Sequence, residues 1–410
     1  MNPLRGAAMI VVIALISCRL SGPAAAAADD PSAPSLVGVG VDGKKLAGRL
    51  TGLTPKGIEL SSGEGAGREI PYREVVKLTR DPLPPPQSTD GSHVLLPGGD
   101  RIMRVVVGAT TETSLDVQSR SSLGKMSIPL DTILGLILAS PAEPDPFDRL
   151  WYLVREEPRS SEVVWLANGD RLSGGFLGMD DRSIRIQVDG KAVEVDRTGV
   201  IGVGFDPAVV GYPRPASDYL EISIADGSRL GVIGARLEKG HILGSTRFGQ
   251  AIRIPASELV QIVPRTDRVA YLSEIKPDKE SYVSYVGQTR PYRADRTAEG
   301  RRFQLQGKTY ERGIGTQSRT LLAFKLRPED RRFQALVGVD DSAGPLGNIV
   351  FKVYADGQVR FTSQPMAARD DPCIIDVDVS GAKVLILATE FGDRGDVRDI
   401  ADWVEARIIR

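Results

Sequence analysis

The chain has 410 residues, more than one ordinary hydrophobic core requires, and its 44 glycines and 27 prolines favour an all-β protein with many turns. The 52 basic and 53 acidic side chains give a formal net charge of −1. This balance excludes the basic excess that nucleic-acid-binding proteins use, so we expect no nucleic-acid partner.

The first 28 residues have the composition of an export signal. Arg5 supplies a positive start, residues 7–17 are apolar but too few to span a bilayer, and small residues at 24–28 precede Asp29. We expect cleavage after residue 28 and an exported chain, located in the periplasm, at the cell surface or outside the cell. No other stretch predicts a membrane span.

An alternative for the same segment is lipid attachment. Residues 15–18, Leu-Ile-Ser-Cys, are similar to a lipoprotein box with Cys18 as the modified residue, which would anchor the chain to a membrane. Arg19 and the alanine-rich site downstream favour ordinary cleavage. If Cys18 leaves with the signal, Cys373 is the remaining cysteine and no internal disulfide can form.

A small unit recurs four times between residues 36 and 266. In each copy a short apolar strand reaches an X-Gly pair, and a basic residue and an apolar residue follow. The four glycines are Gly43, Gly99, Gly169 and Gly227, and the basic residues are Lys45, Arg101, Arg171 and Arg229. The X-Gly pairs predict two-residue type I′ turns, in which both central residues take positive φ.

The third copy is the clearest, with predicted strands at 162–167, 171–177, 183–188, 191–195 and 200–205. Five short antiparallel strands suit a small barrel of the SH3-like or Sm-like kind, because closure hides the strand edges. One copy is small for an independent core, so we expect copies to pack in pairs. The basic residue after each glycine could bind an anionic polymer, but a solvated position or an ion pair is the commoner role.

Proline-rich spacers at 82–86 and 207–217 separate copies, and Asp145 followed by Pro146 predicts a helix that ends near Glu157. The expected organisation is a signal peptide at 1–28, repeat one at 29–81, repeat two at 91–140, a helical linker at 141–160, repeat three at 161–206, repeat four at 218–266 and a β-sandwich at 269–410.

Four motifs in the last 140 residues occur in the order found in a known family. They are Gly-Ile-Gly-Thr-Gln-Ser at 313–318 and the segments 333–341, 349–357 and 399–407. Together they resemble the "novel putative carbohydrate-binding module" (NPCBM) family, which is often appended to glycoside hydrolases and to exported proteins. The resemblance implies a galactose-binding-like jelly-roll β-sandwich, and such sandwiches often hold a structural calcium in acidic loops.

The chain departs from that family at two positions. Gln317 and Ile400 stand where the family usually has histidine, and both changes remove ring donors that could hold a sugar. The fold therefore carries over more safely than the sugar binding. Trp403, Tyr354 and Phe351 lie among apolar residues and are interpreted as core.

Candidate ligand residues are aromatic and polar positions of this domain. Aromatic rings stack on the apolar C–H faces of sugars, while amides, carboxylates and guanidinium groups bind the hydroxyls. The candidate carbohydrate-binding residues are Tyr282, Tyr285, Tyr292, Arg293, Gln317 and Asp340.

The sequence contains none of the common catalytic motifs that we considered. Two histidines are present, and no Gly-x-Ser-x-Gly, His-Glu-x-x-His or cysteine-pair motif occurs, so a triad and a zinc site are not expected. A glycosidase needs two carboxylates, but no acidic pair stands out. We expect no enzyme and no cofactor apart from the structural calcium that the resemblance implies.

Two functions remain open. In the first, an exported, non-catalytic protein recognises a cell-surface or extracellular glycan, such as a galactose-containing polysaccharide, through its C-terminal domain. In the second, the chain is an envelope scaffold whose sandwich is structural and whose β repeats bind protein partners. Exposed tyrosines around one concave patch would favour the first, and apolar patches on the barrels the second.

Overall fold

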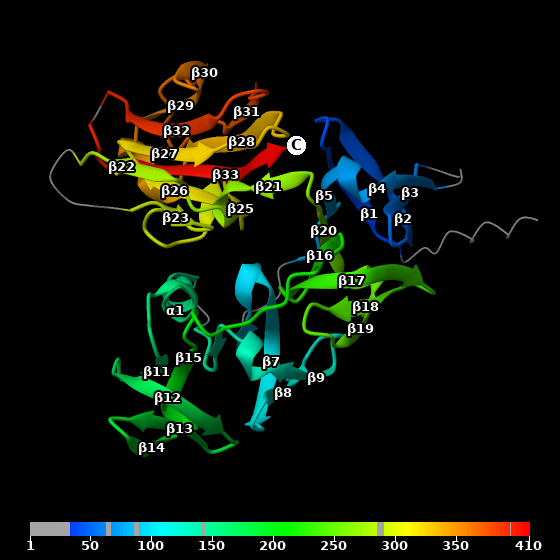
Figure 1. Cartoon of the computed structure of the whole chain (residues 1–410), viewed down its shortest axis with the longest axis vertical. Coiled ribbons are helices and arrows are strands. Elements are labelled where there is room, and N and C mark those ends of the chain that lie inside the picture. Colours follow the sequence, from blue (N-terminus) through cyan, green and yellow to red (C-terminus); the bar gives the residue numbers. More distant parts are fainter. Residues whose placement is uncertain (1–32, 63–66, 86–89, 142–143, 285–290, 394) are drawn as a thin grey trace, which may run out of the picture.

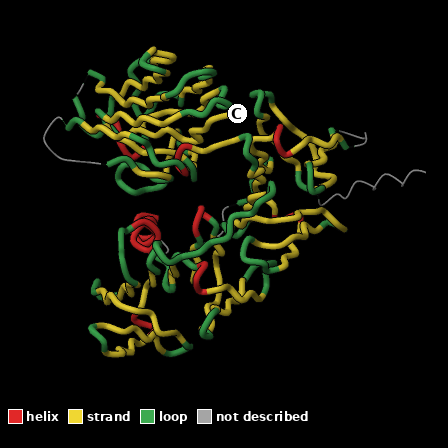
Figure 2. Tube along the Cα trace, viewed as in Figure 1, coloured by secondary structure: helices red, strands yellow, loops and turns green. Residues whose placement is uncertain are grey.

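The chain folds almost entirely into β-structure. The computed structural model describes residues 33–62, 67–85, 90–141, 144–284, 291–393 and 395–410. Strands make up 55% of it and helices 10%, so the predicted all-β fold class is confirmed. Figure 1 shows four small β units, in blue to green, beside a larger sandwich in yellow to red, and Figure 2 shows how little helix the chain contains.

Each small unit consists of five strands with a short 3₁₀ helix before the last one. Repeat one holds β1 (Ser35–Gly40), β2 (Lys45–Leu53), β3 (Gly57–Ser61), β4 (Arg68–Pro71), η1 (Tyr72–Glu74) and β5 (Val75–Arg80). Repeat two holds β6 (Ser92–Leu95), η2 (Pro97–Gly99), β7 (Arg101–Thr110), β8 (Ser114–Ser119), β9 (Lys125–Pro129), η3 (Leu130–Thr132) and β10 (Gly135–Ile137).

The other two units follow the same order. Repeat three holds β11 (Glu162–Leu166), β12 (Arg171–Met179), β13 (Ser183–Val188), β14 (Lys191–Asp196), η4 (Arg197–Gly199) and β15 (Val200–Gly204). Repeat four holds β16 (Tyr219–Ile224), β17 (Arg229–Glu238), β18 (His241–Thr246), β19 (Ala251–Pro255), η5 (Ala256–Glu258) and β20 (Leu259–Arg265). In every unit the first strand pairs with both the second and the fifth, which partly closes the sheet and hides its edge.

Three of the four turns after the first strands differ from the prediction, because Asp42, Asn168 and Asp226 do not take positive φ. In repeat two Gly98 and Gly99 both take positive φ, as predicted. Gly169 takes φ +92°, as expected, but the preceding Asn168 does not take positive φ. Gly169 N donates to Leu166 O at 3.0 Å, and Asn168 Oδ1 accepts from Asp170 N at 3.0 Å. The type I′ prediction was therefore wrong here: a three-residue turn ends in a left-handed glycine, because the Asn side chain stabilises a negative φ at its own position.

The repeats pack in two pairs, and one of these pairs joins repeats that are far apart along the chain. The last strands of repeats one and four pair through Thr79 and Gln261, and those of repeats two and three pair through Leu136 and Val203. Repeats two and four also meet, where β7 and β17 form a bridge. Buried apolar residues of all four units form one continuous core cluster, which explains how such small units are stabilised together.

Helix α1 (Pro144–Glu156) connects repeats two and three and covers the strands where they pair. Phe147, Trp151 and Val154 are buried in a separate cluster with Ile137 and Trp165 of the two repeats. The rings of Phe147 and Trp151 lie 5.6 Å apart. In the described part of the chain, no helix combines the length and the apolar character needed to cross a bilayer.

The sandwich is built from two antiparallel sheets. Its elements are β21 (Val269–Tyr271), η6 (Leu272–Glu274), β22 (Lys279–Tyr282), β23 (Arg293–Ala294), β24 (Phe303–Leu305), β25 (Lys308–Tyr310), β26 (Gly313–Gln317), β27 (Thr320–Lys325), β28 (Arg332–Val339), η7 (Asp341–Leu346), β29 (Ile349–Ala355), β30 (Gln358–Thr362), β31 (Cys373–Asp378), β32 (Val384–Phe391) and β33 (Ile400–Ile409). One sheet has the order β23-β26-β33-β28-β31, with β21 beside β33, and the other has β22-β27-β32-β29-β30. Phe351 and Trp403 are fully buried between the sheets, as predicted, but Tyr354 is only half-buried because its position alternates with the core positions of β29.

Buried ion pairs join the sandwich to the repeats. Glu221 of repeat four is 4% exposed and pairs with Arg312 of the sandwich and with Arg229 at 3.6 Å. Burial alone would raise the pKa of Glu221, but Arg312, Arg229 and Arg265 outweigh it and lower that pKa to about 2. Glu221 is therefore a buried carboxylate held ionised by cations from both domains.

The basic residues of the repeat motif take part in these contacts. Arg101 of repeat two and Arg229 of repeat four both pair with Glu311 of the sandwich, and Arg171 pairs with Glu157 at 3.3 Å. The expectation that such residues pair with acids is confirmed for these three. Arg101 and Arg171 pair with acids outside their own repeat, whereas Arg229 pairs both with Glu311 of the sandwich and with Glu221 on the adjacent strand of its own repeat.

Candidate functional site

The loops that connect the two sheets gather at one side of the sandwich. Gln317 pairs with Ile400, and Thr320 pairs with Thr389, so strands of both sheets begin or end there. We call this side the loop end; it comprises the described residues of 318–319, 340–348, 363–372 and 392–399. Loop surfaces carried on a rigid β scaffold are common places for binding sites.

Asp399 connects three of these loops from beneath. It is 1% exposed, and Ser318 Oγ donates to its Oδ2 while Asn348 N donates to its Oδ1 at 2.9 Å. Burial raises the pKa of Asp399, and the hydrogen bonds from Ser318 and Asn348 partly offset this. Asn348 Oδ1 in turn accepts from Asp393 N at 2.9 Å. The polar network fixes the loops relative to one another.

A charged pair lies on this scaffold at the surface. Arg319 Nε is 2.9 Å from Glu390 Oε2, and the Arg319 side chain is 45% exposed. Arg319 O accepts from Val283 N at 2.9 Å, which places the end of β22, with Tyr282, next to it. The loop end thus offers a guanidinium donor, a carboxylate acceptor and a nearby aromatic ring.

Three of the candidate residues lie at this end of the sandwich. Tyr282 is half-buried and pairs with Thr320. Gln317 is the last residue of β26 and is 5% exposed, and Asp340 is 1% exposed, with its oxygens accepting from Ser342 N at 2.9 Å and Gln304 N at 2.8 Å. Gln317 and Asp340 therefore support the loops and offer little surface to a ligand.

The remaining candidates lie elsewhere or outside the described residues. Tyr292 is half-buried and packs against the sandwich core, and burial and Glu280 raise its pKa. Arg293 donates from Nε to Ala298 O at 3.0 Å, and its guanidinium lies 4.5 Å from the centre of the Tyr152 ring of α1. Arg293 is thus turned toward the repeats. Tyr285 falls in the segment that the structure does not describe.

Acidic residues lie in and beside β33, in the region where the resemblance implies a structural calcium. Asp402 is fully buried beside Asp340, and burial followed by Asp340 and Asp341 raises the pKa of Asp402 well above its usual value. Within the described residues, no group of three or more His, Cys, Asp or Glu side chains is arranged to hold a metal. Both carboxylate oxygens of Asp402 are buried without a hydrogen-bond partner among the described residues, and the calcium that the resemblance implies stays a prediction.

Comparison with known proteins identifies the sandwich. Residues 268–409 match the model of a family described as the NPCBM/NEW2 domain. These residues form an NPCBM/NEW2 domain. The sequence resemblance is therefore confirmed, and the C-terminal third of the chain is a domain of the carbohydrate-binding-module class.

Two curated relatives share similarity over part of the chain. A Renibacterium salmoninarum protein named "Putative endo-alpha-N-acetylgalactosaminidase" is 25% identical over 157 residues, 35% of this chain and 10% of that protein. The "Alpha-1,3-galactosidase B" of Akkermansia muciniphila is 29% identical over 137 residues, 32% of this chain and 17% of that protein. The chain thus spans less than a fifth of the length of either relative.

Solved carbohydrate-binding modules are also similar to this chain. A CBM51 module from a Clostridium perfringens GH95 protein, solved in complex with methyl-galactose, is 24% identical with a TM-score of 0.32 and covers 34% of this chain and 99% of that one. A two-domain structure from Clostridium perfringens ZmpB, with CBM51-2 bound to GlcNAc, is 22% identical with the same TM-score and covers 47% of this chain and 40% of that one.

The sequence-based search for site residues missed Arg319, Glu390 and Asn348. Arg319 directly follows the Gly-Ile-Gly-Thr-Gln-Ser motif, so its position after a recognised motif was the available signal. Glu390 and Asn348 come from strand ends far along the chain, and only the pairing of β27 with β32 and of β32 with β29 brings them beside it.

Proposed function

We propose that this chain is an exported, non-catalytic protein that recognises a glycan through the loop end of its NPCBM/NEW2 domain. The family match over residues 268–409 is the observation that carries the proposal. The loop end supports it, since Arg319 and Glu390 provide a donor and an acceptor for vicinal sugar hydroxyls, and Tyr282 provides a ring for stacking.

Binding at such a surface is expected to be weak. The loop end presents separate polar groups rather than a deep enclosure, so a bound sugar buries little area. Because the names of the two curated relatives contain galactose and N-acetylgalactosamine, glycans that end in these sugars are the first ligands to test.

The test is a glycan array probed with the full chain and two matched variants. Arg319→Gln removes the exposed guanidinium, and we expect about tenfold weaker binding, the usual effect of losing a hydrogen bond from a charged group. Lys325→Gln is the control, because Lys325 is an exposed cation at the opposite end of the same strand, β27. Both proteins should have the same melting temperature.

Two results would contradict this function. If the array shows no glycan bound by the full chain, or if both variants weaken binding equally, the loop end is not a glycan site. The chain would then be better explained as an envelope scaffold whose repeats bind protein partners.

Export is the second part of the proposal. The charged, apolar and small-residue segments of residues 1–28 support it, and this segment lies outside the described residues. Mass spectrometry of the protein from its native cell should find Asp29 at the N-terminus. A diacylglyceryl group on Cys18 would instead show that the chain is a membrane-anchored lipoprotein.

A further inference from the structure

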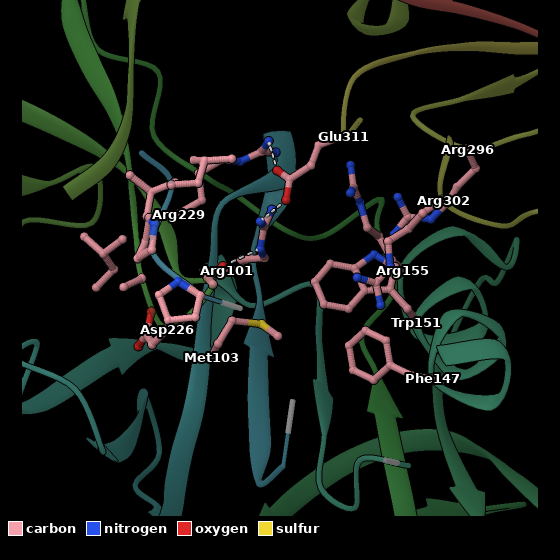
Figure 3. A pocket seen from close by; sticks show the side chains of 17 residues that line it. Arg101, Met103, Phe147, Trp151, Arg155, Asp226, Arg229, Arg296, Arg302 and Glu311 are labelled. Atoms are coloured by element: carbon pink, nitrogen blue, oxygen red, sulfur yellow. Dashed lines mark hydrogen bonds and ion pairs between the residues drawn. The ribbon is translucent and has the colours of Figure 1, made fainter. Parts of the chain in front are cut away.

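A cavity of about 630 Å³ lies where repeats two and four, helix α1 and the sandwich meet. Figure 3 shows its walls: Arg101 and Met103 come from β7, Trp151 and Phe147 from α1, and Glu311 from the sandwich. Leu83, from the spacer after repeat one, also lines the cavity and is 60% exposed, so the cavity reaches the surface there. A volume of this size suits a small ligand.

Guanidinium groups outnumber carboxylates among the residues that line this cavity. Its walls carry two carboxylates, Asp226 and Glu311, and five guanidinium groups, from Arg101, Arg155, Arg229, Arg296 and Arg302. Glu311 is occupied by two of these arginines, Arg101 and Arg229. Arg155, Arg229 and Arg302 also pair with Glu156, Glu221 and Asp148, which do not line the cavity. Arg296 is therefore the guanidinium that an entering anion would meet without an ion-pair partner among the described residues.

Of these five arginines, Arg296 has its positive charge least balanced by neighbouring carboxylates. It is 7% exposed, no carboxylate of the described residues lies within ion-pair distance of it, and its Nη1 donates to the carbonyl of Asp295 at 2.7 Å. Burial, followed by repulsion from Arg155, lowers the pKa of Arg296 to about 10. Burying a cation without a partner is costly, so a bound anion would stabilise this part of the wall.

Another part of the wall is apolar and flat. The guanidinium carbon of Arg101 lies 5.9 Å from the centre of the Trp151 ring, and that of Arg296 lies 5.7 Å from it. Phe147 packs beside the same ring. Asp226, on another wall, accepts one hydrogen bond at Oδ1 from Ser228 N, while its Oδ2 has no partner among the described residues. The walls thus combine anion-binding donors, an aromatic surface and a carboxylate acceptor.

We propose that this cavity binds a sugar that carries a carboxylate, such as a uronic acid. Arg296, whose buried Nε has no hydrogen-bond partner among the described residues, binds the carboxylate. Trp151 packs against the apolar C–H face, and Asp226 accepts from a ring hydroxyl. A simple inorganic anion would use the arginines but leave the aromatic wall and the acceptor unused. This site is separate from the loop end, so it does not depend on glycan recognition there.

The experiment titrates the full chain with D-glucuronate and D-galacturonate and follows tryptophan fluorescence and heat of binding. The matched neutral sugars, glucose and galactose, and acetate as a simple carboxylate are the ligand controls. We expect the uronates to bind about tenfold more tightly than any control, because each control lacks one of the recognised groups. Raising the salt concentration should weaken uronate binding.

Variants locate the site. Arg296→Gln should weaken uronate binding about tenfold. Arg149→Gln, which removes an exposed arginine of α1, a helix that lines the cavity, should not change it. Arg296→Lys keeps the positive charge and should restore part of the binding, which separates loss of the cation from misfolding. Arg319→Gln should leave uronate binding unchanged, so this result is independent of the test of the loop end.

Three results would overturn the proposal. These are equal binding of uronates and neutral sugars, binding of acetate as tight as that of uronates, and uronate binding that is the same in Arg296→Gln and Arg149→Gln. If Arg296→Gln is unstable, the comparison of Trp151→Leu with Trp165→Leu decides, because Trp165 lies in the same apolar cluster but does not line the cavity.

Discussion

The interior of the sandwich and its junction with the repeats are held together by different forces. Inside the sandwich, Phe351 and Trp403 contact edge to face, with ring centres 5.1 Å apart, and Trp403 Nε1 donates to Thr389 Oγ1 at 3.1 Å. At the junction, buried carboxylates such as Glu221 and Glu405 face arginines and lysines of the other domain. The sandwich interior is mainly apolar, with Asp402 as a buried exception, whereas the junction combines ion pairs with a small apolar cluster.

The two regions have different roles, since the core stabilises the sandwich and the junction sets the relative position of the domains. Apolar burial is not directional, so the sandwich core needs only residues of suitable size and pattern. Buried ion pairs repay their desolvation only when both partners are in place, so the junction is sensitive to the loss of either partner. The ion pairs, together with an apolar cluster that includes Val76, Tyr271 and Ile409, therefore set the relative position of the two domains and of the cavity between them.

The largest expected effect is at the junction. Glu221→Gln removes the buried carboxylate that Arg312 and Arg229 share and leaves them only the more exposed Glu274 and Glu311. We expect a loss of about 3 kcal/mol in the free energy of unfolding. The matched control in the same repeat is Glu238→Gln, because the Arg236–Glu238 pair is about half exposed and should contribute less than about 1 kcal/mol. Urea unfolding of both variants measures this, and equal losses would contradict the ionic role of the junction.

Lowering the pH should destabilise the junction before it destabilises the sandwich core. The pKa of Glu221 is about 2 in the folded chain, below the usual 4.5, so its stabilisation is complete above pH 4.5 and is lost as the pH falls toward 2. The shift corresponds to about 3 kcal/mol. Melting temperatures measured across this range should fall steeply for the natural sequence and less steeply for Glu221→Gln. Parallel curves would show that Glu221 does not control the acid response.

The repeats offer a smaller, purely backbone effect. Gly169 takes φ +92° with open space where a side chain would lie, so Gly169→Val forces a β-branched residue into the left-handed region at a cost of about 1–2 kcal/mol. Gly199, in the same repeat, has equally open space without positive φ. Gly199→Val should therefore cost less than Gly169→Val in thermal unfolding. The reverse order would contradict the assignment of the turn.

The smallest effect belongs to the acid inside the sandwich, and its sign is opposite to that of Glu221. Because burial raises the pKa of Asp402, the folded chain holds a proton that the unfolded chain releases above about pH 4, and stability falls as the pH rises from there. Asp402→Asn imitates the protonated acid and should gain about 1 kcal/mol at neutral pH. A loss of stability, or a melting temperature that rises with added Ca²⁺ only in the natural sequence, would show that Asp402 binds a cation instead.

Local sequence patterns were sufficient for the elements of this fold. Alternating apolar residues and turn glycines such as Gly169 predicted the strands, and the motifs at 313–318 and 399–407 predicted the sandwich. The turn type was mistaken because it depends on whether Asn168 takes positive φ, and its own side-chain hydrogen bond decided against that. Such a bond depends on geometry that residue type alone does not specify.

The candidate site was less predictable than the fold. Tyr282 was found at the loop end, but Gln317 and Asp340, chosen for their motifs, are buried supports. Arg319 and Glu390 are adjacent only because β27 and β32 pair. Sequence reasoning identifies which residues could bind a ligand, whereas exposure and juxtaposition depend on contacts between segments far apart in the chain.

The sequence by itself determined the β fold class, four copies of one unit and the NPCBM/NEW2 domain, because each of these depends on local patterns of apolar residues, glycines and motifs. Only the tertiary structure decided that repeat one pairs with repeat four, that Arg101 and Arg229 meet at Glu311, and that a cavity rich in arginine lies between the domains. The reason is physical: strand formation depends on neighbours along the chain, while ion pairs and cavities depend on which distant segments folding brings together.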